Sequence, residues 1–280
     1  MPLIDVQHLT FAYRDQDVLS DVCLTLQAGE HLAILGGNSC GKTTLGHWLA
    51  GRLTRALNTS SSGTLYFDGR PWDQYSSIER AQAVQFVGQL PEQQITGLAY
   101  SVEEEIAFGV RNLGLPEPQV RQRVDHVLQA CGLQDLAQVN PFNLSGGELQ
   151  RLSIAAAMAM QPRLLILDEP GSNLDPASRR RLVDSLQQLQ ADTTLILLDV
   201  SVELAVHLAR RLTVLEQGQL YHYQDVDALL KSAQSRRSLI ANPAADVSLL
   251  LRDAEIVADD SRLPLTADAL VQELKEASHA

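Results

Sequence analysis

Gly36-Gly37-Asn38-Ser39-Cys40-Gly41-Lys42-Thr43 is the stretch on which the fold of this 280-residue chain depends. It matches G-x-x-x-x-G-K-[ST], the pattern of a phosphate-binding loop. The apolar residues 31–35 before it predict a buried strand, and residues 42–50 after it predict a helix. Backbone N–H groups and the helix dipole meet at such a helix start and bind phosphate oxygens. A glycine turn without a ligand is the alternative, but it leaves the agreement of strand, loop and helix unexplained, so the chain is predicted to bind a nucleotide.

Four residues of the loop have roles that follow from their chemistry. Gly36 and Gly41 are expected to let the backbone approach the phosphates closely. Lys42 is expected to neutralise charge on the β- and γ-phosphates, and Thr43 to bind Mg²⁺ through its hydroxyl group.

The composition narrows the class of protein. Asp and Glu number 34 against 22 Lys and Arg, a net charge of −12, which argues against nucleic-acid binding as the main role. No run approaches the roughly 18–20 apolar residues of a membrane span, and the N-terminus lacks a signal-peptide pattern. Cys23, Cys40 and Cys131 lack metal-ligand spacing and suit a reducing compartment. We expect a cytoplasmic protein, or a peripheral subunit of a larger assembly.

The segments before and after the phosphate loop predict further strands. Residues 3–11 and 22–26 read as strands, and residues 58–62 as a polar linker. Residues 63–67 alternate in polarity and turn back as a hairpin. Tyr13 follows the first strand, where its ring can stack on a base or pack against the core.

A glutamine-rich segment follows the short apolar strand predicted at residues 84–87. Gln89 lies directly beyond that strand, and Pro91 prevents the strand from continuing. A glutamine in this place can reach a metal ion or a water molecule and move with a neighbouring domain. An ordinary surface loop is the alternative.

A helical block is predicted between the strands of the α/β core. Ser101 and Glu104 have the spacing of a capping box that opens a helix. Apolar residues at helical spacing follow Pro116: Val120, Val124, Val127, Leu128 and Cys131.

A second helix start carries two glycines. In Leu144-Ser145-Gly146-Gly147-Glu148-Leu149-Gln150-Arg151, Ser145 and Glu148 again have capping-box spacing. Gly146 and Gly147 each cost about 1 kcal/mol relative to alanine inside a helix. They are understandable if a ligand approaches the backbone closely, which indicates a second anion site.

Two acids end the apolar run at residues 164–167, which is typical of a parallel sheet covered on both faces. Asp168 and Glu169 therefore lie where α/β folds place their chemistry. Asp168 is expected to hold Mg²⁺ through water, and Glu169 to polarise an attacking water. A solvated turn is the alternative.

The last part of the chain contains one more helix start and three more strands. Asp175 is a predicted cap, with Pro176 at the first helical position. Strands are predicted at residues 194–198, 211–215 and 219–223. Beyond residue 223 the patterning loosens, and residues 224–280 are predicted to form a small C-terminal appendage.

In their order along the chain, these motifs resemble the ATP-binding subunits of ABC transporters. The resemblance covers residues 1–223, and Leu-Ser-Gly-Gly-Glu-Leu-Gln-Arg is highly specific to that family. It implies an α/β fold of the P-loop NTPase type, with a mixed sheet, an antiparallel β subdomain, an inserted α-helical subdomain at about residues 100–160 and the C-terminal appendage. Residues 89–94 and 102–109 resemble those of energy-coupling factor (ECF) transporter ATPases. Those importers take up vitamins or transition metal ions with two ATPases, a membrane coupling protein and a substrate-binding membrane protein.

The resemblance also implies site residues. Tyr13 would stack on adenine. ATP phosphates and Mg²⁺ would be held by Gly36, Asn38, Ser39, Cys40, Gly41, Lys42, Thr43 and Thr44. Gln89 would bind the metal, sense the γ-phosphate and report to the membrane subunit, while Asp168 would bind the metal and Glu169 act as catalytic base. Ser145, Gly146 and Gly147 would act on nucleotide held by a partner chain, and Asp175 would link the two sites.

This chain departs from the family pattern at two positions. Ser39 stands where the family usually has a second glycine. Val200 stands where the family has a switch histidine, although residues 198–205 match the family segment in length. Valine offers no hydrogen bond to a γ-phosphate, and general-base catalysis contributes roughly 10²–10⁴ in rate. We therefore expect an impaired site in this chain, and a heterodimer with a paralogous ATPase rather than a homodimer.

Other classes of protein compete with a transporter subunit on the cytoplasmic face of the membrane. ABC ATPases of the chromosome or repair type insert a long coiled coil, but the segment between Lys42 and Ser145 has room only for the helical block. A regulatory ABC protein that binds nucleotide without hydrolysis and without a transporter is the remaining alternative.

Overall fold

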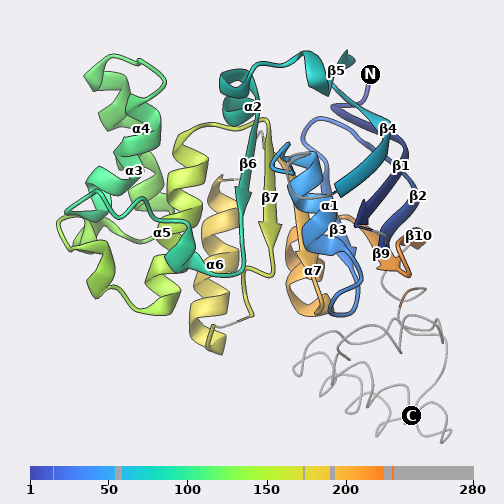
Figure 1. Ribbon diagram of the computed structural model, residues 1–280. Coiled ribbons are helices and arrows are strands. Elements are labelled where there is room, and N and C mark those ends of the chain that lie inside the picture. The colour runs from blue at the N-terminus through green and yellow to red at the C-terminus, as the bar shows by residue number, and fades with distance from the viewer. Residues whose placement is uncertain (15, 54–58, 173, 190–192, 224–228, 230–280) are drawn as a thin grey trace, which may run out of the picture.

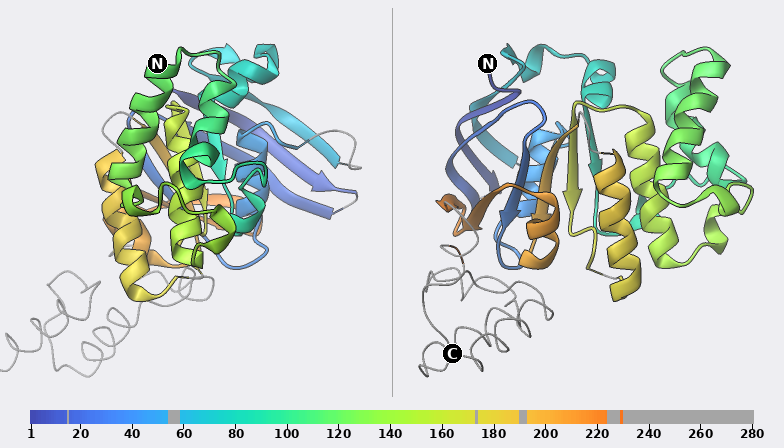
Figure 2. Two further views of the ribbon diagram at one scale, coloured as in Figure 1. Left: turned by 90° about the vertical axis from the view of Figure 1, so that its left-hand side faces the viewer. Right: turned by 180° about the vertical axis from the view of Figure 1, so that it is seen from behind.

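The computed structural model describes residues 1–14, 16–53, 59–172, 174–189, 193–223 and 229 (Figure 1). A six-stranded sheet lies in the middle, with a smaller antiparallel sheet on one side and a lobe of helices on the other (Figures 1 and 2). The predicted C-terminal appendage lies outside the described residues, except for the buried Leu229. None of the helices in the described ranges is both long enough and apolar enough to cross a bilayer.

The central sheet is mixed, as predicted. In spatial order its strands are β10 (Gln219–Tyr223), β9 (Arg211–Glu216), β3 (His31–Leu35), β8 (Thr194–Asp199), β7 (Leu164–Asp168) and β6 (Val84–Val87). All neighbours pair in parallel except β10, which is antiparallel to β9. Every residue of β7 and β8 is buried, because both faces of a parallel sheet are covered.

Each face of the central sheet packs into its own core. Along the strands, successive side chains point to opposite faces. One face of β3, β7 and β8 joins the core that includes the helical lobe, and the other face joins the core shared with the antiparallel sheet. The central sheet is thus the rigid middle layer that positions the loops at its edge.

The antiparallel sheet has the strand order β2-β1-β4-β5. Its strands are β1 (Ile4–Tyr13), β2 (Gln16–Leu26), β4 (Thr59–Phe67) and β5 (Arg70–Pro71). The polar linker predicted at residues 58–62 was wrong for residues 59–62, which belong to β4. These residues pair with the second half of β1, from Thr10 with Ser62 to Tyr13 with Thr59, so that the backbone ladder organises a serine-rich segment without apolar patterning.

The helices are α1 (Lys42–Leu49), α2 (Ser77–Ala83), α3 (Val102–Arg111), α4 (Glu117–Ala130), α5 (Gly146–Ala159), α6 (Pro176–Leu189) and α7 (Val202–Leu208). Short 3-10 turns occupy Trp72–Gln74, Pro91–Gln93, Gln134–Leu136 and Pro141–Asn143. α3, α4 and α5 form the lobe on the side of the central sheet away from the antiparallel sheet (Figure 1).

The predicted helix caps are present, but the capping box at Ser101 and Glu104 is only half formed, because the Glu104 carboxylate accepts from the Tyr100 N–H and not from that of Ser101. The Ser101 hydroxyl accepts a hydrogen bond from the Glu104 backbone N–H at the start of α3. The Asp175 carboxylate accepts from the backbone N–H groups of Ala177 and Ser178 at the start of α6. Such caps satisfy donors that a helix start leaves without partners.

Candidate functional site

The loop between β3 and α1 contains two residues in the left-handed backbone region. Gly41 has φ +107° and Ser39 has φ +62°. A residue with a Cβ atom pays roughly 1–2 kcal/mol for this conformation. Glycine is therefore the natural residue at position 39, as the comparison with the family pattern predicted, and Ser39 is strained there.

Gly36 is required by packing within the chain itself. A Cβ atom at Gly36 would lie 2.5 Å from the carbonyl oxygen of Leu215 and 2.6 Å from the Cys40 sulfur. The loop therefore starts in close contact with the end of β9. Cys40 is partly buried, and burial raises the pKa of its thiol, so that the thiol stays protonated at neutral pH.

The ammonium group of Lys42 lies inside the loop. The side chain is buried, and Nζ donates hydrogen bonds of 3.0 Å to the carbonyl oxygens of Gly36 and Gly37. The same Nζ lies 3.5 Å from Oε1 of Glu169, which follows β7. The ammonium group is thus held where it can bind an anion in the loop.

Asp168, at the end of β7, faces the first turn of α1. Its Oδ2 accepts a hydrogen bond of 2.7 Å from the Thr43 hydroxyl, and among the described residues its buried Oδ1 has no hydrogen-bond partner. Burial raises the pKa of the Asp168 carboxyl, the Thr43 hydrogen bond lowers it, and the nearby Glu169 raises it. Hydroxyl and carboxylate oxygens are the donors that Mg²⁺ prefers. The unsatisfied Oδ1 beside Thr43 fits a metal ion or a water bound to one.

Gln89 and Glu169 lie together, although 80 residues separate them in the sequence. The Gln89 side-chain amide donates a hydrogen bond of 3.0 Å to Glu169 Oε2. Glu169 has φ +46°, and its N–H donates to the carbonyl oxygen of Leu198 on β8. The strand end therefore turns sharply and presents the carboxylate toward Lys42 and Gln89, and such local strain is common at functional sites.

These groups line an open hollow of about 530 Å³, a size typical of a small-molecule site. Its lining residues are Tyr13, Val18, Asn38, Ser39, Gly41, Lys42, Thr43, Thr44, Gln89 and Glu169. The Tyr13 ring packs edge-to-face on Phe11, with 5.0 Å between ring centroids, and remains partly exposed. The structure thus brings nearly all the predicted phosphate, base and catalytic residues of this chain to one place.

Two residues near the hollow were missed by the sequence analysis. Val18 lines it from β2, and was missed because that strand was predicted to begin at residue 22 instead of Gln16. Asp199 ends β8, and its Oδ1 accepts hydrogen bonds from the backbone N–H groups of Val200 and Ser201. An acid that ends an apolar run, as Asp168 does, was the signal that could have found Asp199.

Burial raises the pKa of Asp199 to about 6, against the two backbone hydrogen bonds, which lower it. Glu169 raises this pKa further, and Lys42 lowers it. The next residue, Val200, has a buried apolar side chain that offers no proton donor or acceptor.

Ser145, Gly146 and Gly147 do not line the hollow. Ser145 caps α5 reciprocally with Glu148: each backbone N–H donates to the other's side chain, at 2.8 and 3.4 Å. A Cβ atom at Gly147 would lie 2.9 Å from the Ser178 hydroxyl, so helix packing explains this glycine. A Cβ atom at Gly146 would meet nothing within 4 Å. One glycine thus has an internal reason, and the other leaves open space at the helix start.

Comparisons with known proteins agree with this arrangement. The profile of the ABC transporter family matches residues 19–172. Cobalt import ATP-binding protein CbiO of Syntrophus aciditrophicus is 44% identical over 184 residues, which cover 65% of this chain and 63% of that protein. The energy-coupling factor transporter ATP-binding protein EcfA1 of Oceanobacillus iheyensis is 30% identical over 277 residues, which cover 97% of this chain and 96% of that protein.

A solved structure is also similar: cbiO1 from Clostridium perfringens, part of the ABC transporter complex cbiONQ. It has a TM-score of 0.69 and 30% sequence identity, over 79% of this chain and 87% of that one. Coverage of the sequence relatives varies. The chain spans 63% of the Syntrophus protein and 36 to 54% of several other relatives.

Proposed function

This chain belongs to the ABC transporter family, and we propose that it is the ATP-binding subunit of an energy-coupling factor importer. In this proposal, ATP binding and hydrolysis in a dimer of ATPases drive uptake through a membrane coupling protein and a substrate-binding membrane protein. Residues 1–223 would form the ATP-binding domain and residues 224–280 a small C-terminal domain. The whole would lie peripherally on the cytoplasmic face of the membrane.

The observation that carries the proposal is the convergence of Lys42, the Thr43–Asp168 pair and the Gln89–Glu169 pair around one hollow. Mg-ATP brings the transferable phosphoryl group and a metal that neutralises charge on the phosphate oxygens.

Within the hollow, the chain's own residues divide the work. Lys42 and the loop N–H groups would bind the phosphates, and the Tyr13 ring would stack on the adenine. Thr43 and Asp168 would hold the metal, and Gln89 would be a further ligand. Glu169 accepts the proton of the attacking water and is oriented by its hydrogen bond from Gln89.

The separation of the Ser145 helix start from the hollow supports a role for it in a second chain's site. Gly146 presents open space and backbone N–H groups at the start of the 14-residue helix α5, where an anion is favoured. We propose that these groups bind the phosphates of ATP held by the partner ATPase. Two chains would then contribute to each site.

Val200 favours a heterodimer over a homodimer. Val200 stands at the switch position. Its apolar side chain can neither position Glu169 nor contact the γ-phosphate, as the histidine expected there would. A homodimer would carry this defect twice. A partner that has the histidine would give one complete site, made of its own phosphate loop and this chain's Ser145–Gly147.

The transported substrate is proposed as a vitamin or a metal ion. The name of the Syntrophus relative, a cobalt import protein, supports a metal ion as one class. Specificity itself would lie in the membrane partners.

The test is steady-state ATP hydrolysis by the purified chain, alone and co-expressed with an ABC ATPase of the same organism that carries the histidine. We expect slow turnover alone and fast turnover in the mixed complex. Val200→His should raise the rate of the chain alone by about 10²-fold or more. Val200→Leu, which keeps the site apolar, is the matched control and should change little.

Ordinary turnover by the chain alone, unaffected by Val200→His, would contradict the impaired site and the heterodimer. The second candidate, a regulatory nucleotide binder without hydrolysis, is favoured by Val200 alone. It predicts no turnover in any complex and no co-purification with membrane proteins.

A further inference from the structure

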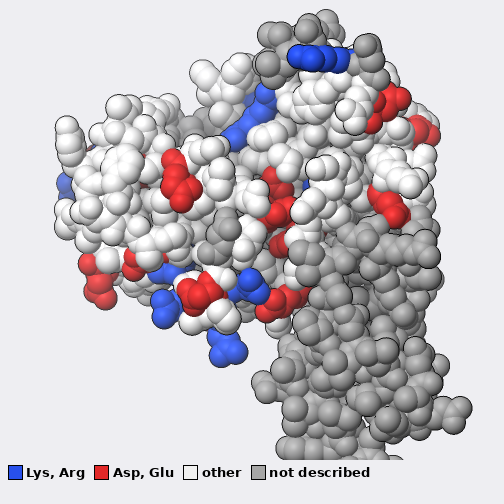
Figure 3. Space-filling view, turned by 60° about the horizontal axis from the view of Figure 1, so that its bottom comes forward, with Lys and Arg blue, Asp and Glu red and all other residues white. Residues whose placement is uncertain are grey.

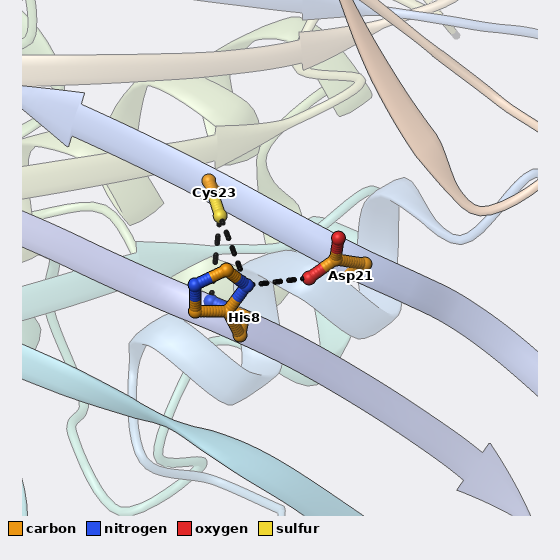
Figure 4. A group of neighbouring side chains, drawn as sticks. All are labelled: His8, Asp21 and Cys23. Atoms are coloured by element: carbon orange, nitrogen blue, oxygen red, sulfur yellow. Dashed lines mark hydrogen bonds and ion pairs between the residues drawn. The ribbon is translucent and has the colours of Figure 1, made fainter.

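One group of side chains with metal-binding chemistry lies outside the hollow, on the outer face of the antiparallel sheet. It consists of His8 on β1 and Asp21 and Cys23 on β2 (Figure 4). One donor atom from each, an imidazole nitrogen, a carboxylate oxygen and a thiol sulfur, lies within 4.8 Å of the other two. Among the described residues it is the only such group of three or more His, Cys, Asp and Glu side chains.

Two irregularities in strand pairing build this group. The register of β1 and β2 shifts between the pairs Val6–Leu24 and Leu9–Val22, and again before Phe11–Leu19. His8 and Asp21 lie in these shifts, with φ of +53° and +52°, values that a residue with a side chain adopts only at a cost. Bulges of this kind redirect side chains.

The effect of the bulges is to bring three polar side chains to the same face. Leu9 and Val22 stay buried, while His8, Asp21 and Cys23 are all exposed. The side chains converge from the two neighbouring strands in Figure 4. Neighbours hold them in place: the His8 N–H points to the Cys23 sulfur at 3.4 Å, and the Asp21 N–H donates to the Thr10 hydroxyl.

The distances are close to those that a metal ion requires. His8 Nδ1 lies 2.7 Å from Asp21 Oδ1 and 3.9 Å from Cys23 Sγ. A tetrahedral ion with bonds of about 2.0–2.3 Å would set donors about 3.3–3.6 Å apart. Shifts of the donor atoms by less than about 1 Å would therefore bring all three to one ion, and exposed side chains have room to make such shifts.

We propose that His8, Asp21 and Cys23 bind a divalent transition-metal ion of the zinc class. Imidazole and thiolate donors select Zn²⁺, Co²⁺ or Ni²⁺ over Mg²⁺ and Ca²⁺. Three protein ligands leave a coordination position for water or for a further ligand, as in zinc sites that are not closed. The ion bridges β1 to β2 on the face of the sheet opposite its core.

The alternative is an ion pair between His8 and Asp21 with a cysteine nearby. Their side chains are 78% and 70% exposed, and such surface pairs contribute about 0–1 kcal/mol. An ion pair does not involve the sulfur, so Cys23 distinguishes the two possibilities.

The test is titration of the tag-free, full-length chain with Co²⁺, followed by absorbance. We expect one equivalent of Co²⁺ to give a thiolate-to-metal charge-transfer band, and Zn²⁺ to abolish it by displacement. Cys23→Ser should remove the band. His8→Asn and Asp21→Asn should each weaken Zn²⁺ binding by at least about 10–100-fold, the loss seen even when only a supporting contact of a metal site is removed.

His126→Asn, at an exposed histidine on α4, is the matched control and should bind Zn²⁺ as the unmodified chain does. Because the three ligands are exposed, metal-free variants should keep the unfolding temperature of the unmodified chain. Zn²⁺ should raise that temperature in the unmodified chain and in His126→Asn, and not in Cys23→Ser.

Two results would overturn the proposal. One is a charge-transfer band that persists in Cys23→Ser, which would assign the ion to another thiol. The other is Zn²⁺ affinity that is the same in all three ligand variants as in His126→Asn, which would leave only the surface ion pair.

Discussion

Ser39 holds a backbone conformation that favours glycine, at φ +62° in the middle of the phosphate loop. Ser39→Gly should relieve a cost of roughly 1–2 kcal/mol in the folded state, while glycine loses about 0.5–1 kcal/mol more through chain entropy. The net expectation is a gain of about 0.5–1 kcal/mol in unfolding free energy. Urea denaturation of the nucleotide-free chain measures it.

Asn38→Gly is the control in the same loop, because Asn38 does not have a positive φ. The unfolding free energy of Asn38→Gly should fall by about 0.5–1 kcal/mol, because glycine loses more chain entropy on folding and no backbone strain is relieved. Equal losses in both variants would show that Ser39 is not strained.

Asp199 makes stability depend on pH. Its pKa is about 6 in the folded chain and 3.8 ordinarily, so between these values the folded state holds the proton more tightly. The unfolding free energy therefore falls as pH rises from about 4 to 6, and the full penalty remains above that range. Asp199→Asn keeps an oxygen for the Val200 and Ser201 N–H groups and removes the penalty.

The unfolding free energy of Asp199→Asn should exceed that of the unmodified chain by on the order of 1 kcal/mol at pH 4.5, rising to about 3 kcal/mol at pH 7.5. Denaturation at several pH values in this window gives the difference. A difference that stays constant with pH would show that Asp199 is not the group that titrates.

At the residue scale, most of the hollow could be predicted because its residues follow parallel strands. Asp168, Glu169 and Gln89 lie at the end of an apolar strand or within two residues of it, and the carboxyl ends of parallel strands meet at one edge. Lys42 reaches the same edge because the phosphate loop connects it to the end of β3. Asp199 follows the same rule, because it ends the buried strand β8 as Asp168 ends β7. Its raised pKa depends on burial, which a sequence does not display.

At the scale of elements, the two adjacent glycines at the start of α5 have different surroundings, although they look equivalent in the sequence. A Cβ atom at Gly146 would meet only open space, and alanine is favoured over glycine in a helix by about 1 kcal/mol. Gly146→Ala should therefore stabilise the isolated chain by about 0.5–1 kcal/mol. If a partner's ATP approaches this turn, the same change should lower hydrolysis in the mixed complex.

Gly147→Ala is the contrasting variant. Its Cβ atom would approach the Ser178 hydroxyl to 2.9 Å, so the gain in helix propensity is offset by displacement of α6. Denaturation of the isolated chain and hydrolysis by the complex separate the two effects. Unchanged hydrolysis in Gly146→Ala would contradict a nucleotide contact at this turn.

Elements with strong apolar periodicity were predicted well, and those built by pairing were not. The strand β3 and the buried face of α4 follow directly from their patterns. Thr59–Phe67 begins with polar residues, and it forms a strand because its backbone pairs with that of β1. The site at His8 was missed for the same reason: strand pairing, with two bulges, brings it to Asp21 and Cys23.

At the scale of the whole molecule, large apolar side chains are exposed on the segment between Gln89 and α3 and on the helical lobe that follows it. They are Leu90, Leu98, Tyr100, Phe108 and Phe142. A Cβ atom at Gly97 would lie 3.8 Å from the Phe142 ring, which brings the loop before α3 next to the turn before α5. Where exposed apolar side chains lie next to one another, they commonly mark a partner surface.

One face of the molecule shows no concentration of charge of a single sign (Figure 3). On the face shown in Figure 3, acidic and basic residues are interspersed, and much of the surface over the helical half is uncharged. Contact with the proposed membrane partner would then depend on apolar side chains. Three of them, Leu90, Leu98 and Tyr100, lie on the segment that follows Gln89, whose side chain donates a hydrogen bond to Glu169. A partner that moves the segment after Gln89 would therefore also move Gln89, which lines the hollow.

The double change Leu98→Ser and Tyr100→Ser should therefore weaken association with the proposed membrane partner and leave the isolated chain folded. Both side chains are largely exposed, at 70% and 82%, so their loss removes little from the core. Co-purification with membranes, and with the coupling protein after detergent extraction, measures the effect. Ile78→Ser, at an equally exposed apolar residue on α2, is the control and should retain association. If both variants associate equally well, the partner contacts another face, and the loop that carries Gln89 is not the link between the membrane and the ATP site.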